Sequence, residues 1–529
     1  MSTPFPGFCG PSYQLQNRYA AIERTVNWYP IANESTGETK WKVALEPCPG
    51  NASFCALPVP APFNQPCRGL IENRGYVYGV NGDTVFAIDS SGTFLNVGNV
   101  LNDSKPVSMV ANGTGQIFIA SGGLGYVIPK FGGALSLLPV SDPGFLGASY
   151  ATFQDGYIIV VTPDSNQFQV SGDDNTPLGD ALIWDAANVS VQAGQADFLR
   201  AVISSREYLR LFGARRSQVY QNVGNNGIGG FPFQSYNETF IETGIAAPFS
   251  LCEMGDSLIW IGESDRGLRA CWRDSAFQPT RISNFAVEQF WQNYVRVDDA
   301  VAFSFIWNGH LLYQITFPSA YQSGVAFPFG TPGAFTGATW VYDATVSQLL
   351  GRPCWHERAY QTALGFANQR SEMFHCYAFG KHLIGSTGID GNPGAIYQYS
   401  DMAYTDCGTD IDGTQVQQAI VRDRICPHLW SNNKRIIYDR IEFEMARGVG
   451  LDGGVFGSDP QVLLRWSNDG GNTFGPEQNI GAGLIGQYGR RVYWNRGGYG
   501  RDRVYWLRCT DPNYWGIVGA ELDIRECGS

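Results

Sequence analysis

Two short strings place carboxylates beside other titratable side chains, His356-Glu357 and Asp298-Asp299. Hydrolysis of a glycosidic bond needs two carboxyl groups roughly 5 to 10 Å apart that face one cleft. Neighbouring residues of a strand point to opposite faces of a sheet, so neither string forms a converging pair. Solvation at the surface explains these carboxylates more simply, and we predict no catalytic residue.

Metal and nucleotide sites are not indicated either. The five histidines show neither an HxxxH spacing nor a His/Cys metal-ligand spacing, although His375 and Cys376 are adjacent. The sequence has no GxxxxGK(S/T) loop, no GxGxxG that joins a strand to a helix, and no GxSxG elbow. We therefore expect no cofactor and no metal, and core or hairpin roles for His310, His356, His375, His382 and His428.

The sharpest local motif runs from Ser467 to Phe474 and reads Ser-Asn-Asp-Gly-Gly-Asn-Thr-Phe. Ser, Asp, Gly and an aromatic residue at this spacing resemble the Asp-box turn of sialidase propellers. In such a turn the Asp side chain accepts hydrogen bonds from turn amides, and the aromatic ring anchors the loop. One copy indicates a hairpin rather than a catalytic centre, and the predicted structural residues are Ser467, Asp469, Gly471 and Phe474.

Arginines alternate with aromatic residues near the C-terminus. Such a pattern suits a nucleic-acid surface, but Arg and aromatic residues also anchor protein interfaces. The chain is acidic, with a net charge of -12, which is the wrong sign for tight binding to phosphates. A subunit interface is therefore the favoured interpretation, with DNA contact left open, for Arg490, Arg491, Trp494, Arg496, Arg501, Arg503, Trp506 and Arg508.

Composition predicts an all-β protein of two or three domains. Of the 529 residues 44% are hydrophobic, 14% aromatic and 16% charged, while 64 Gly and 28 Pro supply turns. The first residues lack a basic and apolar leader, and apolar stretches such as Tyr157 to Val161 are far too short to span a membrane. Twelve cysteines, scattered from Cys9 to Cys527 without a CxxC pair, are interpreted as reduced core thiols.

The elements that must carry these residues are short strands separated by turns. Tyr76 to Val80 and Thr84 to Ile88 flank an Asn-Gly turn, and Phe153 to Val161 turns at Gln154-Asp155-Gly156. Similar aromatic hairpins recur until about residue 404, which favours a β-propeller. Phe285 to Tyr294 is the best candidate for a short helix. We expect an N-terminal platform segment over 1–60, a propeller over 61–404, and a C-terminal β-rich platform module over 405–529.

An ordered series of short strings runs along the chain: Asn27-Trp28-Tyr29-Pro30, Glu46-Pro47-Cys48-Pro49-Gly50, Asp155-Gly156-Tyr157, Leu211-Phe212-Gly213, Pro232-Phe233, Gly255 to Gly262, Arg281-Ile282-Ser283, Ala286-Val287-Glu288, Arg465 to Gly471, Arg490-Arg491, Trp494 and Thr510-Asp511-Pro512. This series resembles the packaged DNA stabilisation proteins, the tail hub or nozzle subunits of short-tailed bacteriophages. The resemblance covers nearly the whole chain. It departs at Ser217 to Tyr220, where a Glu-x-Trp is expected, and in the number of cysteines.

The resemblance implies a β-propeller with a β-rich platform formed by the chain ends, and a structural role in the virion tail. It implies six copies in a ring below the portal and its adaptor, in contact with tail fibres or spikes and a tail needle or plug. The ring would close the channel after packaging and conduct double-stranded DNA without sequence-specific binding, with assembly in the host cytoplasm and no membrane insertion. The alternatives are a propeller glycosidase or depolymerase and a receptor-binding lectin for host-surface glycans.

Overall fold

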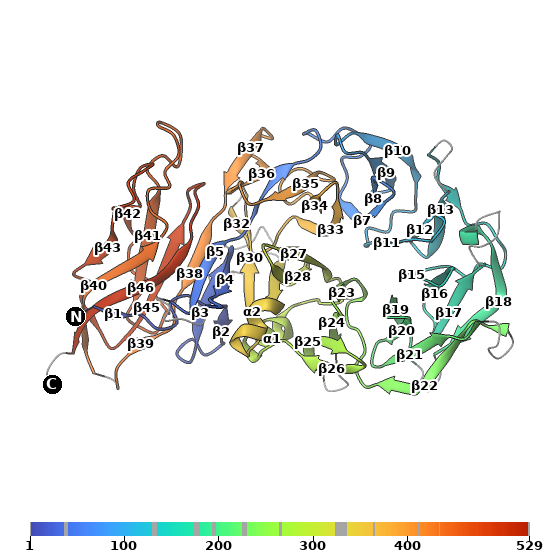
Figure 1. The fold of residues 1–529 in the computed structure, drawn as a ribbon, viewed down its shortest axis with the longest axis horizontal. Helices are drawn as coiled ribbons and strands as arrows, with labels where there is room; N and C mark the ends of the chain where they lie inside the picture. The colour runs from blue at the N-terminus through green and yellow to red at the C-terminus, as the bar shows by residue number, and fades with distance from the viewer. Residues whose placement is uncertain are drawn as a thin grey trace.

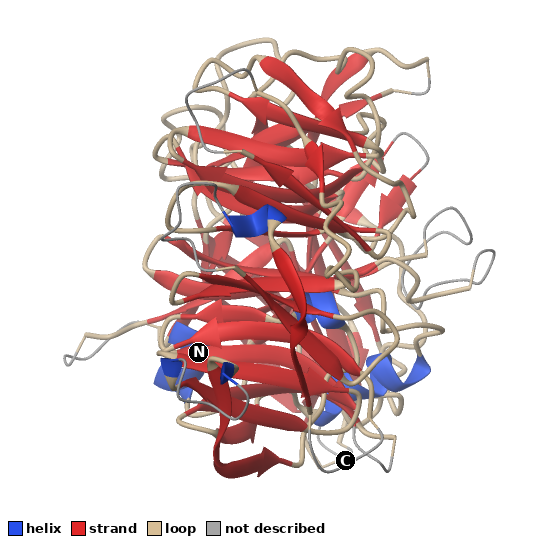
Figure 2. Cartoon of the chain, turned by 90° about the vertical axis from the view of Figure 1, so that its right-hand side faces the viewer, coloured by secondary structure: helices blue, strands red, loops and turns tan. Residues whose placement is uncertain are grey.

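The computed structural model describes residues 2–35, 41–129, 135–172, 180–192, 197–224, 230–263, 267–322, 336–362, 365–410, 412–432 and 434–526. Strands dominate (Figure 2), and a ring of small sheets lies beside a two-sheet sandwich (Figure 1). No helix of the described residues is long and apolar enough to cross a membrane. The predicted all-β class is confirmed.

Six four-stranded antiparallel sheets stand around the ring as blades, which confirms the predicted β-propeller. Five blades use consecutive strands, and the sixth takes its outermost strand from the N-terminal region. The blades are β7 (Cys67–Asn73), β8 (Tyr76–Asn81), β9 (Thr84–Ile88) and β10 (Phe94–Asn99); β11 (Ser108–Ala111), β12 (Ile117–Ser121), β13 (Leu124–Ile128) and β14 (Leu138–Pro139); β15 (Tyr150–Gln154), β16 (Tyr157–Val161), β17 (Gln167–Ser171) and β18 (Trp184–Val191); β19 (Leu199–Ser205), β20 (Tyr208–Gly213), β21 (Ser217–Asn222) and β22 (Phe233–Ile241); β23 (Cys252–Met254), β24 (Ser257–Glu263), β25 (Arg269–Ser275) and β26 (Gln278–Arg281); β33 (Glu372–Ala378), β34 (Lys381–Ser386), β35 (Ile396–Ser400) and β6 (Gly50–Ser53).

A further four-stranded unit lies between the fifth and sixth blades and belongs to a larger, 11-stranded sheet. Its innermost strand, β27, contacts both β23 and β33. Its outermost strand, β30, pairs with β3 of the neighbouring sandwich, so this unit joins the ring to the rest of the molecule. The unit comprises β27 (Val301–Trp307), β28 (His310–Phe317), β29 (Ala338–Asp343) and β30 (Trp355–Arg358).

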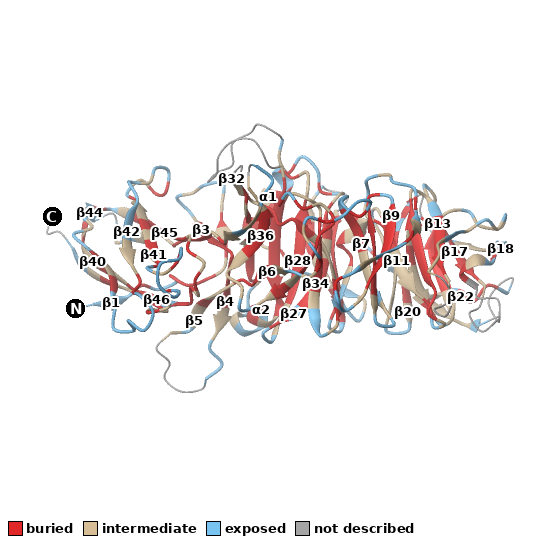
Figure 3. Ribbon diagram, turned by 90° about the horizontal axis from the view of Figure 1, so that it is seen from above, coloured by how far each residue is buried: buried red, intermediate tan, exposed pale blue. Residues whose placement is uncertain are grey.

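The apolar runs form strands because the blades pack face to face. In β16 the residues Ile158 to Val161 are all buried, as expected for a strand covered on both faces. Its hairpin turns at Asp155 and Gly156, both with positive φ, of 50° and 91°. This is the backbone that a two-residue hairpin turn requires. Figure 3 shows the buried strands continuing from the propeller into the sandwich, with exposed residues mainly in loops.

The sandwich consists of a seven-stranded sheet packed on the far part of the 11-stranded sheet. Trp28, Phe443, Leu507 and Trp515 lie in the core between them. The smaller sheet contains β1 (Thr3–Pro4), β4 (Trp28–Ala32), β5 (Val43–Pro47), β40 (Ile436–Met445), β43 (Val492–Asn495), β44 (Tyr499–Gly500) and β46 (Ile517–Glu526). The larger contributes β2 (Tyr13–Gln14), β3 (Ile22–Val26), β38 (Arg422–Ile425), β39 (Leu429–Trp430), β41 (Gln461–Ser467), β42 (Gln478–Gly481) and β45 (Asp502–Cys509).

The N-terminal region contributes strands to the larger sheet, to the smaller sheet and to the sixth blade. β3 pairs in parallel with β30 and antiparallel with β38. The chain then turns at Asn27, whose φ of 58° is left-handed, and enters the other sheet as β4. The buried Asn27 side chain donates to the carbonyls of Ala359 and Val421 and accepts from the amide of Ala359. Asn27 therefore fixes the corner at which the two sheets meet.

The domain limits expected from the sequence, 1–60, 61–404 and 405–529, do not all coincide with the parts of the fold. Both chain ends build the sandwich, since β5 and β1 each pair with β46. However, β6 lies within segment 1–60 and completes a propeller blade. Segment 405–529 opens with a hairpin of β36 (Thr405–Thr409) and β37 (Gln415–Ala419). This hairpin contacts β6 and the short strand β31 (Tyr360–Thr362), and the short strand β32 (Gly365–Ala367) lies nearby.

The helices and cysteines complete the fold. The helix expected at Phe285 to Tyr294 is present as α1 (Phe285–Asn293), where the Asn284 side chain accepts from the amide of Val287 as an N-cap. The second helix of the described residues is α2 (Ala344–Leu350). The described cysteines form no disulfide, and all of them are buried except Cys252, which is partly buried. Cys527 lies outside the described residues.

The corner at Asn27 gives a testable expectation. Asn27→Ala should lower the free energy of unfolding by roughly 3 to 5 kcal/mol, because three buried backbone groups lose their partner and alanine is strained at positive φ. Denaturant unfolding followed by tryptophan fluorescence measures this. Asn27→Gly is the matched control: it loses the same hydrogen bonds but tolerates the backbone, so it should be about 1 kcal/mol less destabilised than alanine. Wild-type stability in the alanine variant would contradict the assignment.

Candidate subunit interface and buried polar sites

The predicted Arg–aromatic cluster does not form one surface. Its strand β45 lies in the middle of the larger sheet, between β38 and β41, and every second residue of it faces the sandwich core. Three members are buried: Trp494, Arg503 and Trp506. Arg508 is partly buried, and the exposed members are Arg490, Arg491, Arg496 and Arg501.

The cluster members on β45 use both faces of the larger sheet: Arg503 lies on the face of the sandwich core, whereas Trp506 and Arg508 lie on the opposite face, beside Val504 and Phe474. The guanidinium carbon of Arg503 lies 3.9 Å from the centre of the Tyr438 ring, and its nitrogens donate to Asn468 Oδ1 at 2.8 and 2.9 Å. Arg508 donates two hydrogen bonds to Asp423, at 2.7 and 2.8 Å. The indole nitrogen of Trp506 donates to the same carboxylate at 2.9 Å. These contacts leave Asp423 satisfied inside the fold.

The interface prediction is therefore corrected for Trp494, Arg503 and Trp506, because buried side chains cannot meet a partner. It remains a prediction for the exposed arginines. Arg490 and Arg491 lie in the loop between β42 and β43, where Arg491 pairs with Glu442 at 2.5 Å. The other two, Arg496 and Arg501, flank the short strand β44.

The turn after β41 has the geometry that the Asp-box motif requires. Asp469 Oδ1 accepts from the amides of Asn472 and Thr473, at 3.0 and 2.9 Å, and Oδ2 accepts from the Thr473 hydroxyl at 2.6 Å. The Ser467 hydroxyl donates to Asp469 and accepts from the amide of Gly471. The Phe474 ring packs edge-on against Trp506, with ring centres 5.2 Å apart. The motif thus anchors a loop on the sandwich.

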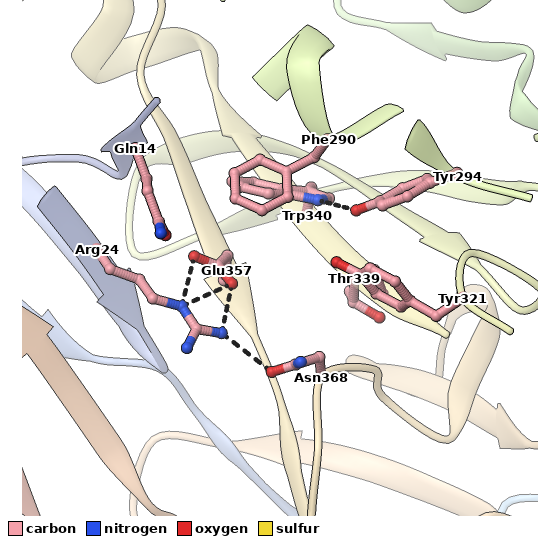
Figure 4. A pocket seen from close by; sticks show the side chains of 10 residues that line it. Gln14, Arg24, Phe290, Tyr294, Tyr321, Thr339, Trp340, Glu357 and Asn368 are labelled. Atoms are coloured by element: carbon pink, nitrogen blue, oxygen red, sulfur yellow. Dashed lines mark hydrogen bonds and ion pairs between the residues drawn. The ribbon is translucent and has the colours of Figure 1, made fainter. Parts of the chain in front are cut away.

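A pocket at the junction of propeller and sandwich contains Glu357, one of the carboxylates considered above (Figure 4). Arg24 of β3 donates to both carboxylate oxygens of Glu357, at 2.7 to 3.0 Å, and to Asn368 Oδ1 at 3.0 Å. On the opposite wall Trp340 donates to the hydroxyl of Tyr294 at 2.9 Å. Since these polar groups already satisfy one another, the pocket is a structural joint between β3 and β30.

Neither carboxylate string forms an acid/base pair. His356 is buried, and desolvation, together with the nearby Arg358 charge, holds its pKa well below the usual range. Asp298 is exposed and accepts two hydrogen bonds from Arg296, which lower its pKa. Glu357 is thus held by Arg24 in the joint, and Asp298 by Arg296 at the surface.

Four of the five histidines lie within hydrogen-bonding distance of another titratable side chain. His375 Nε2 lies 3.0 Å from His382 Nδ1, and burial followed by the His382 charge lowers the pKa of His375 to about 3. His310 lies 2.7 Å from Asp343, and His428 lies 2.7 Å from Asp502. Over the described part of the chain, no group of three or more His, Cys, Asp or Glu side chains is arranged to hold a metal ion.

Sequence reasoning missed a buried ionic cluster where the sixth blade closes. Arg370 donates to both oxygens of Glu372, at 2.8 and 2.9 Å, and to both oxygens of Asp406, at 2.5 and 2.9 Å. Asn51 of β6 donates to Glu372 at 2.5 Å and accepts from the amide of Cys407. Although desolvation opposes the charge, the two carboxylates raise the pKa of Arg370 well above its usual value. The spacing Arg370-x-Glu372 was a local sign, but its other partners are remote in sequence.

The Asp-box turn gives a second expectation. Although desolvation raises it, the hydrogen bonds from Ser467, Thr473 and Asn472 lower the pKa of Asp469 to about 2. Asp469→Ala should cost roughly 1 to 3 kcal/mol of unfolding free energy, measured by thermal unfolding at pH 7.

The same experiment has a pH control. Because the folded pKa is depressed, the contribution of Asp469 is complete above the unfolded pKa near 4 and is lost as pH falls towards 2. The difference between variant and wild type should therefore shrink over this interval. An equal difference at pH 2.5 and pH 7 would count against the carboxylate as its source.

Solved structures with a similar arrangement share little sequence with the chain. A putative 6-phosphogluconolactonase from Bacteroides fragilis is 12% identical over 68% of this chain and 95% of that chain, with a TM-score of 0.39. Virginiamycin B lyase from Staphylococcus aureus is 11% identical over 57% and 94%, with a TM-score of 0.32. At these TM-scores neither likeness carries an argument about this chain. No curated protein sequence matches it.

Family models match both parts of the fold. The model described as "Bacteriophage P22 Gp10, beta-propeller" matches residues 66–325. The model described as "Bacteriophage P22 Gp10, beta-sandwich" matches residues 422–525, the strands from β38 to β46. Together they cover more than half of the chain, in the order that the structure shows. The chain therefore belongs to the bacteriophage P22 Gp10 family and is a structural protein of a bacteriophage.

Proposed function

We propose that this chain is a tail hub or nozzle subunit of a short-tailed bacteriophage. The observation that carries the proposal is the family match to both the propeller and the sandwich. The architecture supports it, since β3 and β6 tie the two parts into one body suited to bearing load. By the resemblance of its strings, the subunit would form a six-fold ring below the portal and adaptor. It would bind tail fibres or spikes and a needle or plug.

The ring would close the DNA channel after packaging and conduct the duplex during ejection. A net charge of -12 supports passage without sticking, because like charges repel the phosphate backbone. Within the predicted Arg–aromatic cluster, any DNA contact would involve the exposed Arg490, Arg491, Arg496 and Arg501. Assembly would take place in the host cytoplasm, and the mature location would be the virion tail.

A non-enzymatic role fits the carboxylates described above. Glu357 is committed to Arg24, and Asp298 is committed to Arg296. The glycosidase, depolymerase and lectin alternatives would need a converging set of carboxylate, Arg and aromatic side chains in an open cleft. The junction pocket offers such residue types, but its charged groups are paired with one another.

Labelling of intact particles tests the proposed location. Antibodies raised against the purified chain should decorate only the tail vertex of the phage that encodes it, as seen by electron microscopy with gold-conjugated secondary antibody. Serum depleted on the purified chain is the control. Labels spread over the whole capsid, or found only on host debris and never on particles, would contradict a tail subunit.

A further inference from the structure

Two loops at one end of the sandwich carry an exposed apolar cluster. The loop 446–460 follows β40, and the loop 482–491 follows β42. They are joined by backbone hydrogen bonds from Gly448 to Ala482 and from Gly486 to Gly448. We call their exposed apolar side chains the loop tip, which consists of Leu451, Val455, Phe456, Leu484, Ile485 and Tyr488.

The loop tip is more apolar than a surface that contacts only water needs to be. Phe456 is 68% exposed, Ile485 60% and Tyr488 70%, although each could have been polar without loss to the core. Contiguous apolar clusters of this kind mark interaction sites on soluble proteins. The centre of the cluster is apolar and Arg447, Arg490 and Arg491 lie beside it in the same loops. An apolar centre with arginines at its rim is the composition of a protein interface.

The two ends of the molecule differ in charge. Residues 422–526, the C-terminal part of the sandwich, contain 14 Lys and Arg against 13 Asp and Glu, a net charge of +1. Residues 67–191, the first three blades, contain 10 Asp and 1 Glu against 2 Arg and 2 Lys, a net charge of -7. The sandwich and these blades lie at opposite ends of the long axis (Figure 1). The acidic blades are therefore complementary to the arginines that lie beside the loop tip of a second copy.

The acidic blades also present an exposed apolar cluster of their own. The Leu101 side chain packs against Gly122, which precedes Leu124 by two residues. The amide of Ala148, two residues after Leu146, donates to the carbonyl of Gly123, so Leu146 lies near the same turn. We call Leu101, Leu124 and Leu146, each 41 to 49% exposed, the leucine patch. Asp83 is exposed beside it, since its carbonyl accepts from the amide of Val100.

We propose that the loop tip of one copy docks on the leucine patch of a second copy of this chain. This inference rests on the proposed function and names the surfaces by which its ring would form. The contact joins different surfaces of the two copies, and such head-to-tail contacts close into rings when the rotation between copies is right. A lipid surface fits less well, because Asp452 lies within the tip and would have to leave water.

Charge reversal across the contact is the direct test, with self-association of the purified chain measured by sedimentation over a range of concentrations. Arg490→Glu and Asp83→Arg should each weaken association roughly ten-fold, and the double variant should recover most of it. Phe456→Ser with Ile485→Ser should weaken association at least as much. The matched control is Val295→Ser with Ile306→Ser, exposed apolar residues of the propeller region, which should associate like wild type.

Unchanged melting temperatures show that each variant is folded, so a loss of association cannot be caused by unfolding. Tip variants that associate like wild type, or a double variant weaker than both single variants, overturn this contact but leave a tail subunit intact. Wild-type protein that stays monomeric at every concentration overturns it as well, and tail labelling then decides the proposed function separately. Binding of the wild type to anionic phosphatidylserine vesicles, lost in the tip variants without self-association, would overturn it in favour of a membrane.

Discussion

One five-residue strand, β3, is the element on which the arrangement of the whole chain depends. Its hydrogen bonds reach β30 on the propeller side and β38 on the sandwich side, so a single extended segment is common to both. Arg24, on this strand, is buried and forms an ion pair with Glu357 of β30. Removing one partner of a buried ion pair leaves a charge without compensation, which costs several kcal/mol. Propeller and sandwich therefore cannot separate without breaking both backbone pairing and this pair.

A second remote contact closes the ring. β6 supplies the outer strand of the sixth blade, and the Arg370 cluster joins it to β33 and β36 through Glu372, Asp406 and Asn51. Buried charges of this kind contribute little net stability compared with apolar packing. They do restrict the partners that can sit together, because each carboxylate needs the same arginine. The cluster thus specifies how the N-terminal region meets the last blade.

The sequence predicted what neighbouring residues determine. The hairpin at Asn81-Gly82, the N-capped helix at Phe285 and the turn at Asp469 all depend on residues within a few positions of one another. The partners of β3 and β6 could not be predicted, because they lie hundreds of residues away along the chain. Arg503 and Trp506 were assigned to a surface by residue type, but Tyr438 and Asp423, remote in sequence, allow their burial.

The central claim is that β3 makes the propeller and the sandwich one cooperative unit. Differential scanning calorimetry of the intact chain tests this most directly, since independent domains unfold in separate transitions. We expect a single transition whose calorimetric and van't Hoff enthalpies agree. Two resolved transitions, each with its own enthalpy and with the propeller remaining folded after the sandwich has melted, would contradict the account.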